Sequence, residues 1–180
     1  MRINKSHIDT IVSRALKASF DKREAAQIKE EASLAVKAYN SMFDAALRKK
    51  VSTMPKNWFR HCSCLKFTVN GQYHMLNAIE EMPTPYSGSC NNLGALTGEM
   101  ADVVVAFYNS KQDLRNERAK AEIQLRSMLS NVSTFAKLLE LWPEGKAFYI
   151  DLDEDAKIKG GLPAIRFDDV NAILGLKKAA

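Results

Sequence analysis

The residues best suited to binding chemistry cluster between positions 48 and 60. Three consecutive basic residues are followed, within ten positions, by an alternation of basic and aromatic side chains. Aromatic rings stack on exposed bases and cations neutralise phosphates, so this combination is typical of surfaces that bind flexible nucleic acid. Alternatively, the aromatic residues only anchor a loop on the core. The predicted macromolecule-binding residues are Arg48, Lys49, Lys50, Lys56, Trp58 and Arg60.

A second group of reactive side chains surrounds two cysteines. His61, Cys62 and Cys64 are close in sequence, and His74 and Cys90 could supply further ligands for zinc. Structural zinc sites usually separate paired cysteines by two to four residues, so the single intervening residue fits poorly. On a strand, Cys62 and Cys64 would share a face as small, half-buried residues. We therefore expect no metal here, and no cysteine nucleophile, because nothing marks a local base.

An acidic run resembles the start of a calcium-binding loop. Asp151, Asp153 and Asp155 match its first three ligand positions, but Ala156 and Leu162 replace the glycine and glutamate that an EF-hand requires. We expect a solvated acidic loop instead. The sequence thus predicts no catalytic residue, no cofactor and no enzymatic activity. If these groups nevertheless bound a metal, the protein could be a metal-dependent enzyme that uses the histidine–cysteine group or this acidic run. We keep this function as an alternative to the binding functions given below.

The elements that would position these residues are mostly helical. Apolar residues between 97 and 132 follow a 4-3 spacing that predicts one long helix, with Lys111 and Arg118 inside its apolar seam. Polar residues in a seam set register or partner choice, or mark where a helix leaves the core, so a homodimer is one expectation. Residues 1–54 carry a second stripe, which predicts a helix that packs antiparallel against 97–132. The charged stretch 21–24 either interrupts that helix or forms an exposed turn of it, and the helical signal then continues from 25 to 51.

The middle and the end of the chain have other patterns. Asn70-Gly71 lies between two alternating segments and predicts a β-hairpin over 62–77. Residues 82–95 are rich in Pro, Gly, Ser and Asn, which indicates a loop. Residues 133–180 predict a small helical unit with Trp142 as a core anchor and a last helix that begins at Asp168 and ends at Gly175. The predicted fold class is α+β, mostly helical, and we expect the 180 residues to form a single domain.

The bulk composition limits where the protein acts. The net charge is +5, and residues 1–60 hold 13 Lys and Arg against 6 Asp and Glu, which favours nucleic acid or an acidic protein surface. The basic residues could equally solvate helix faces. No apolar run is long enough to span a membrane. Three cysteines form no disulfide framework, so we expect a reduced, cytoplasmic protein.

Short motifs spread over most of the chain resemble the nucleotide-modification-associated domain 5 family of phages and prophages. The segments that carry the resemblance are residues 8–24, 55–58, 83–86, 133–144, 162–164 and 170–176. The resemblance implies a phage origin, hence the host cytoplasm, and a role near nucleic acid or host defence. It supplies no catalytic residues.

The leading hypothesis for the function is therefore a non-enzymatic phage-type binding protein. It would inhibit or modulate host nucleic-acid or defence machinery by occupying the surface of a host protein or nucleoprotein complex. The alternative is direct binding of DNA or RNA as an accessory to phage DNA modification, which predicts affinity that falls steeply with salt.

Overall fold

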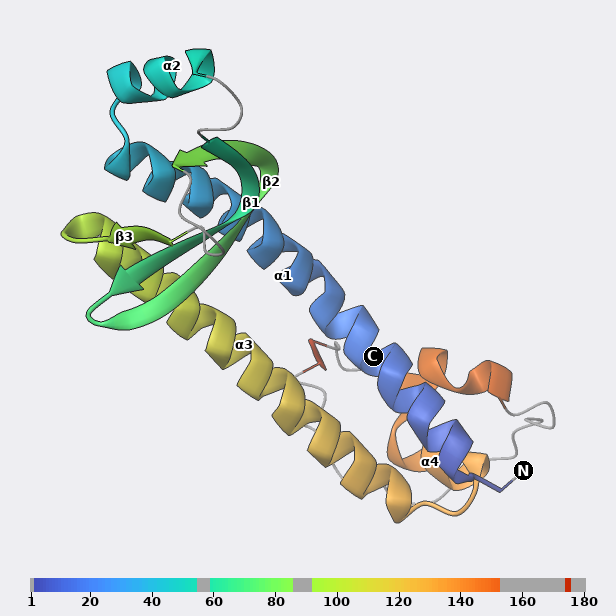
Figure 1. Ribbon diagram of the computed structural model, residues 1–180. Helices are drawn as coiled ribbons and strands as arrows, with labels where there is room; N and C mark the ends of the chain where they lie inside the picture. Colours follow the sequence, from blue (N-terminus) through green and yellow to red (C-terminus); the bar gives the residue numbers. More distant parts are fainter. Residues whose placement is uncertain (1, 55–58, 86–91, 153–173, 176–180) are drawn as a thin grey trace. The chain divides into compact units, whose positions relative to one another are not determined.

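The computed structural model describes residues 2–54, 59–85, 92–152 and 174–175, and its fold is α+β and mostly helical (Figure 1). The chain forms two compact units. The first unit comprises Met1–Glu24 and Asp113–Ala180, and the second unit comprises Ala25–Gln112. None of the helices in the described ranges is long and apolar enough to cross a membrane.

Two long helices contribute to both units. Helix α1 covers Lys5–Met42 and α3 covers Glu99–Ser130, and neither contains Gly or Pro. Their antiparallel pairing, predicted from the two apolar stripes, is confirmed within each unit. In the first unit Asp9 pairs with Arg126 at 2.6 Å, and in the second unit Glu31 pairs with Lys111 at 2.5 Å.

The charged stretch 21–24 is an exposed turn of α1 and not a break. In the first unit both terminal nitrogens of Arg23 donate to the carboxylate of Glu117, at 2.8 and 2.6 Å. The next residue, Glu24, accepts a hydrogen bond from Arg118 of α3. The seam cation Arg118 therefore has its partner within the same chain, and the stretch 21–24 is helical throughout.

Helix α1 ends at Met42, so the prediction of one helix from 25 to 51 is wrong at its end. A separate helix α2 covers Ala45–Thr53. The side chain of Asp44 accepts a hydrogen bond from the backbone N–H of Leu47 at 2.7 Å, which caps the start of α2. The break arises because Asp is a far better N-cap than an interior helix residue.

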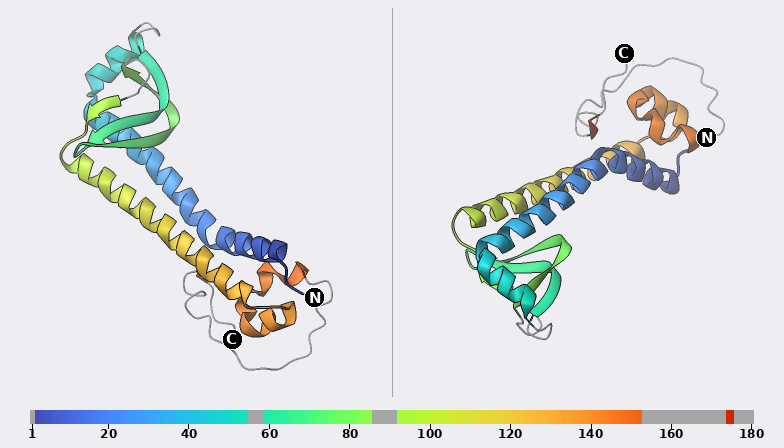
Figure 2. Two further views of the ribbon diagram at one scale, coloured as in Figure 1. Left: turned by 60° about the horizontal axis from the view of Figure 1, so that its bottom comes forward. Right: turned by 90° about the horizontal axis from the view of Figure 1, so that it is seen from above.

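A three-stranded sheet in the order β2-β1-β3 packs on the helices of the second unit (Figure 2). Strand β1 is Phe59–Val69, β2 is Gln72–Pro85 and β3 is Asn92–Ala95. Asn70 and Gly71 both have positive φ, 50° and 78°, as the two-residue hairpin turn requires. The predicted hairpin over 62–77 is confirmed and extends further in both strands.

The predicted loop 82–95 is partly wrong. Residues 82–85 continue β2, and residues 92–95 form β3, which runs parallel to β1. The remainder, residues 86–91, lies outside the described residues. The Pro-rich end of β2 is compatible with a strand because β2 is an edge strand, where a missing backbone donor costs little.

The core of the second unit lies between one sheet face and the helices. Leu65, Phe67 and Val69 of β1 are fully buried there, and Leu65 lies opposite Leu76 of β2. They meet small and aromatic residues of α1 and α3. The buried set is Leu34, Ala35, Ala38, Tyr39, Leu65, Phe67, Val69, Leu76, Met82, Leu96, Ala101, Val104 and Phe107.

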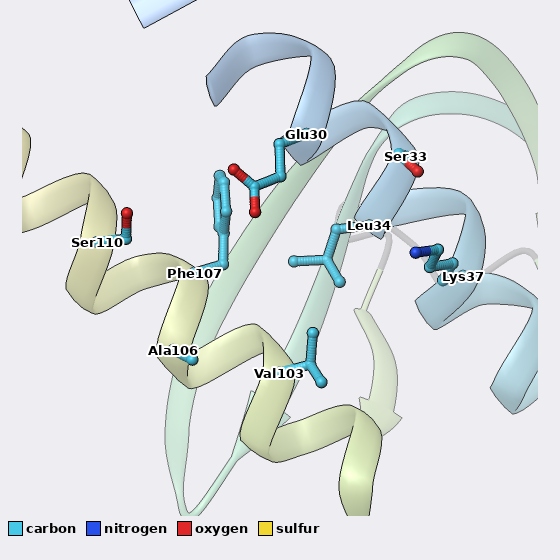
Figure 3. Close-up of a pocket in the computed structure, with 8 residues that line it drawn as sticks. All are labelled: Glu30, Ser33, Leu34, Lys37, Val103, Ala106, Phe107 and Ser110. Carbon is cyan, nitrogen blue, oxygen red and sulfur yellow. The ribbon is translucent and has the colours of Figure 1, made fainter. Parts of the chain in front are cut away.

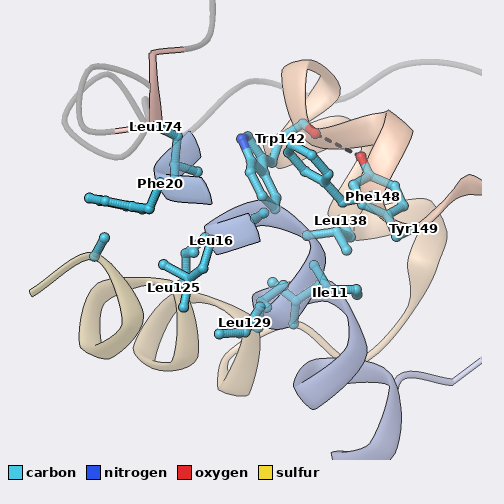
Figure 4. Close-up of a cluster of buried hydrophobic side chains, with 14 of the residues drawn as sticks. Ile11, Leu16, Phe20, Leu125, Leu129, Leu138, Trp142, Phe148, Tyr149 and Leu174 are labelled. Carbon is cyan, nitrogen blue, oxygen red and sulfur yellow. Dashed lines mark hydrogen bonds between the residues drawn. The ribbon is translucent and has the colours of Figure 1, made fainter. Parts of the chain in front are cut away.

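The core of the first unit is centred on Trp142, which is fully buried, so its predicted role as an anchor is confirmed (Figure 4). It lies between helix α4, Phe135–Leu141, and the 3-10 turn η1, Pro143–Phe148; a second turn, η2, covers Ile150–Leu152. The Tyr149 hydroxyl donates to the Trp142 carbonyl at 2.7 Å. Gly175 has the positive φ (66°) predicted for a helix end, but the helix predicted to begin at Asp168 lies outside the described residues.

Candidate nucleic-acid interface

Three of the predicted contact residues lie together on α2. Lys49 and Lys50 are exposed and Arg48 is half-exposed. Consecutive helix positions differ by about 100°, so the three cations fan over more than half of the helix circumference. The Arg48 side chain is oriented by a hydrogen bond that its guanidinium donates to the side-chain oxygen of Asn40. We call Arg48, Lys49 and Lys50 the basic surface of α2.

The end of α1, which precedes α2, is held against strand β2. The Tyr39 hydroxyl donates to the Pro83 carbonyl at 2.6 Å, which ties α1 to β2 directly before α2 begins. Burial raises the pKa of Tyr39, although the Arg48 charge acts in the opposite direction. The phenol therefore stays protonated at neutral pH and keeps this hydrogen bond. The basic surface is thus connected, through Arg48 and Asn40, to a part of α1 that is held against β2.

The other predicted contact residues are only partly placed. Lys56 and Trp58 lie outside the described residues. The backbone of Arg60 belongs to β1, opposite Thr84 of β2. Whether Trp58 binds a partner or anchors its segment stays a prediction.

The charge distribution extends this basic region beyond α2. Residues 45–79 contain six Lys and Arg and not one Asp or Glu, although acidic residues make up 21 of the 180 positions. The charge count over residues 1–60 did not reveal this segment, because residues 1–60 also include the acidic residues of α1. Lys66, in the middle of β1, was also missed. The alternation around Asn70-Gly71 could have placed it on the face that points away from the core.

The two cysteines do not form the pattern expected on a regular strand. The β1–β2 register shifts between Cys62 and Cys64, which removes the strict alternation that would give them a common face. Cys62 is buried and its sulfur accepts a hydrogen bond from Thr84 at 3.6 Å, whereas Cys64 is half-buried. Burial raises the pKa of the Cys64 thiol, which disfavours the reactive thiolate. Across the ranges that the structure describes, no three His, Cys, Asp or Glu side chains gather as metal ligands would.

The acidic run is described only at its start. Asp151 accepts two hydrogen bonds from the Arg14 guanidinium, at 2.6 and 3.0 Å. The bond from Arg14 lowers the pKa of Asp151. This carboxylate therefore serves an ion pair in the first unit, and residues 153–155 lie outside the described residues.

A polar cluster around the buried Glu31 joins the helices of the second unit to the free edge of β2. One carboxylate oxygen of Glu31 accepts from the backbone and side-chain nitrogens of Asn77, at 3.0 and 2.7 Å. The other oxygen pairs with Lys111 at 2.5 Å. The Tyr108 hydroxyl accepts from the Met75 N–H at 2.8 Å and donates to the Met75 carbonyl. We call Glu31, Tyr108 and Lys111 the edge bracket.

The second unit also has a hollow of about 400 Å³ between α1 and α3, away from the strands (Figure 3). Figure 3 shows Leu34 pointing towards Phe107 and Val103, with the Glu30 carboxylate beside the Phe107 ring. One carboxylate and one ammonium group, those of Glu30 and Lys37, offset each other there. The hollow therefore adds nothing to the attraction for an anionic partner. Its lining is Glu30, Ser33, Leu34, Lys37, Val103, Ala106, Phe107 and Ser110.

Comparison with protein-family models matches residues 2–177 to the family described as nucleotide modification associated domain 5. The match covers essentially the whole chain and both units. Neither the curated proteins nor the solved structures gave a match.

Proposed function

Because the chain belongs to the nucleotide modification associated domain 5 family, we propose that it is a non-enzymatic, phage-type protein that binds nucleic acid as an accessory to nucleotide modification. One observation carries the proposal. The basic surface of α2 lies in a segment, residues 45–79, that has six cations and no carboxylate. Phosphates are the ligands that such a surface attracts most strongly.

The geometry of α2 supports contact with a polyanion. Arg48 is hydrogen-bonded to Asn40. Its side chain therefore loses less conformational freedom on binding than an unrestrained side chain would. Lys49 and Lys50 beside it are exposed and lie within the same helical turn. Several phosphates along one strand can therefore be neutralised together, and the released counterions favour binding.

A second candidate is the inhibition of a host nucleic-acid or defence protein, which the family's association also suits. The observation that favours it is Leu47, a large apolar side chain that is exposed on α2 directly beside the cations. Apolar residues adjoining Arg are typical of protein–protein interfaces.

Fluorescence anisotropy with labelled single-stranded and duplex oligonucleotides tests the first candidate. We expect the triple variant Arg48→Glu, Lys49→Glu, Lys50→Glu to lose binding, because it replaces attraction by repulsion. The matched control is Lys17→Glu, Lys22→Glu, Lys120→Glu, which changes the net charge equally at exposed positions of the first unit. Equal affinity of the triple variant and the control would contradict the proposal.

Affinity purification from a host lysate, with and without nuclease, separates the two candidates. Loss of all partners after nuclease treatment would support direct nucleic-acid binding. A stoichiometric host protein that survives nuclease, and that the triple variant no longer retains, would instead support the inhibitor.

A further inference from the structure

The β-hairpin has an outer face that the core does not use. Directly opposed residues of antiparallel strands share a face, and the pairs are Thr68 with Tyr73 and Lys66 with Met75. The intervening residues of β1 are buried on the other face. The outer face of the hairpin near its turn is therefore formed by Lys66, Thr68, Tyr73 and Met75.

Two large side chains on this face are mostly or partly exposed to solvent. Tyr73 is 77% exposed and Met75 is 45% exposed. A tyrosine with most of its ring in water contributes little burial to folding. The ring is instead available for stacking, and a strand holds it at a defined height and spacing.

The charges around the outer face select the class of ligand. Lys66 is the cross-strand neighbour of Met75 and the diagonal neighbour of Tyr73. The Glu31 carboxylate near the β2 edge is 4% exposed and paired with Lys111, so it repels an approaching anion only weakly. Glu80 and Glu81 follow Ile79, which limits the favourable area to the part of the hairpin near the turn.

We propose that the outer face of the hairpin binds single-stranded nucleic acid, with Tyr73 stacking on a base and Lys66 contacting a phosphate. The inference rests on the proposed function and adds a site distinct from the basic surface of α2. An unpaired strand is favoured over a duplex because only its bases expose their rings for stacking on an aromatic side chain.

Binding of a labelled oligothymidine to the full chain tests the site. We expect Tyr73→Ala to weaken binding roughly 5- to 150-fold, the range found when a stacked aromatic is removed. Tyr73→Phe should retain the wild-type affinity because it keeps the ring. Lys66→Ala should reduce the slope of affinity against salt concentration by about one phosphate contact. Ile123→Ala, at a position 69% exposed in the first unit, is the control and should change nothing.

Photo-crosslinking gives a second readout that does not depend on affinity. An oligonucleotide with 5-iodouracil should crosslink to Tyr73, and mass spectrometry should find the adduct on the peptide that contains β2. Crosslinks confined to other peptides would overturn the site.

The outcomes separate this inference from the proposed function. If Tyr73→Ala binds as wild type while the α2 triple variant does not bind, the hairpin site is wrong and the proposed function stands. If Tyr73→Phe loses as much affinity as Tyr73→Ala, stacking is wrong. If the wild-type protein binds no oligonucleotide, both proposals fail. Circular dichroism of each variant confirms that the fold is kept.

Discussion

Glu31 carries a negative charge where burial opposes it. Burial by itself would raise the pKa of Glu31, but hydrogen bonds from Lys111 and from the backbone and side chain of Asn77 outweigh it and lower the pKa. Because the folded-state pKa lies below the unfolded value of about 4.3, ionised Glu31 contributes stability above that pH. This contribution is lost as the pH falls through the folded-state pKa.

Removing the partner of Glu31 tests this account. Lys111→Met leaves a buried carboxylate without its cation and should lower the free energy of unfolding by about 2–3 kcal/mol at pH 7. The loss should shrink as the pH falls, because protonation of Glu31 removes the unpaired charge. Glu31→Gln should cost less, since Lys111 is partly exposed and can be solvated. Chemical denaturation at pH 7 and pH 3.5 measures both, and a loss for Lys111→Met that does not depend on pH would refute the role of the charge.

Position 145 must be a glycine because the Trp142 ring occupies the space that a Cβ would need. A Cβ at this position would lie 2.3 Å from the ring of the fully buried Trp142, so the ring or the turn would have to shift. Gly145→Ala should therefore cost about 1–3 kcal/mol through overpacking, which lowers the melting temperature by several degrees. The neighbouring Lys146→Ala, at an exposed position, is the control and should be almost neutral. Equal melting temperatures for the two variants would show that the turn can relax.

At the scale of the elements, the edge bracket fixes β2 on the helices of the second unit. Tyr108→Phe removes the only group of the bracket that contacts both the N–H and the carbonyl of Met75 among the described residues. We expect faster hydrogen exchange of the Met75 amide with little change at Leu76, whose backbone faces β1. Tyr73→Phe, on the same strand, serves as control. Unchanged exchange at Met75 would mean that the tyrosine hydroxyl contributes no protection.

Local chemistry predicted some elements well. Asn70-Gly71 specified the hairpin because both turn residues must adopt positive φ. The 4-3 spacing between 97 and 132 specified α3 to within two residues at each end. These features are determined by residues that are close in sequence, so a sequence pattern is enough to predict them.

Features that depend on distant partners could not be predicted. Strand β3 is only four residues long and has no alternating pattern, and it pairs with the parallel edge that β1 offers. The partners of the charged stretch 21–24 in α1, Glu117 and Arg118, lie 94 residues away in the sequence. For the candidate interface, the sequence predicted the cations of α2 but not Tyr73, because only strand register separates an outward ring from a buried one.

At the scale of the whole molecule, salt should affect stability and polyanion binding very differently. The net charge is +5, and several ion pairs lie at the surface. The pairs Arg14–Asp151, Arg23–Glu117 and Arg126–Asp9 are largely exposed, so each contributes little to stability. Binding of a polyanion is instead driven by counterion release.

Raising the salt concentration from 50 to 500 mM should therefore shift the melting temperature by only a few degrees. Over the same range, affinity for a single-stranded oligonucleotide should fall with a slope of roughly −2 to −4 on logarithmic axes, as three to five phosphate contacts require. Differential scanning fluorimetry and anisotropy in matched buffers measure the two. A flat affinity would indicate that the basic surface of α2 does not contact phosphates.

The edge bracket also bears on how the protein behaves at high concentration. A free strand edge is a template on which another chain can add a strand, and the exposed Tyr73 and Ile79 would favour such growth. Tyr108 and Glu31 occupy the Met75 and Asn77 backbone groups that a foreign strand would need. Acid that protonates Glu31 weakens this barrier, so the same carboxylate that stabilises the fold also guards the molecule against fibrillar self-association.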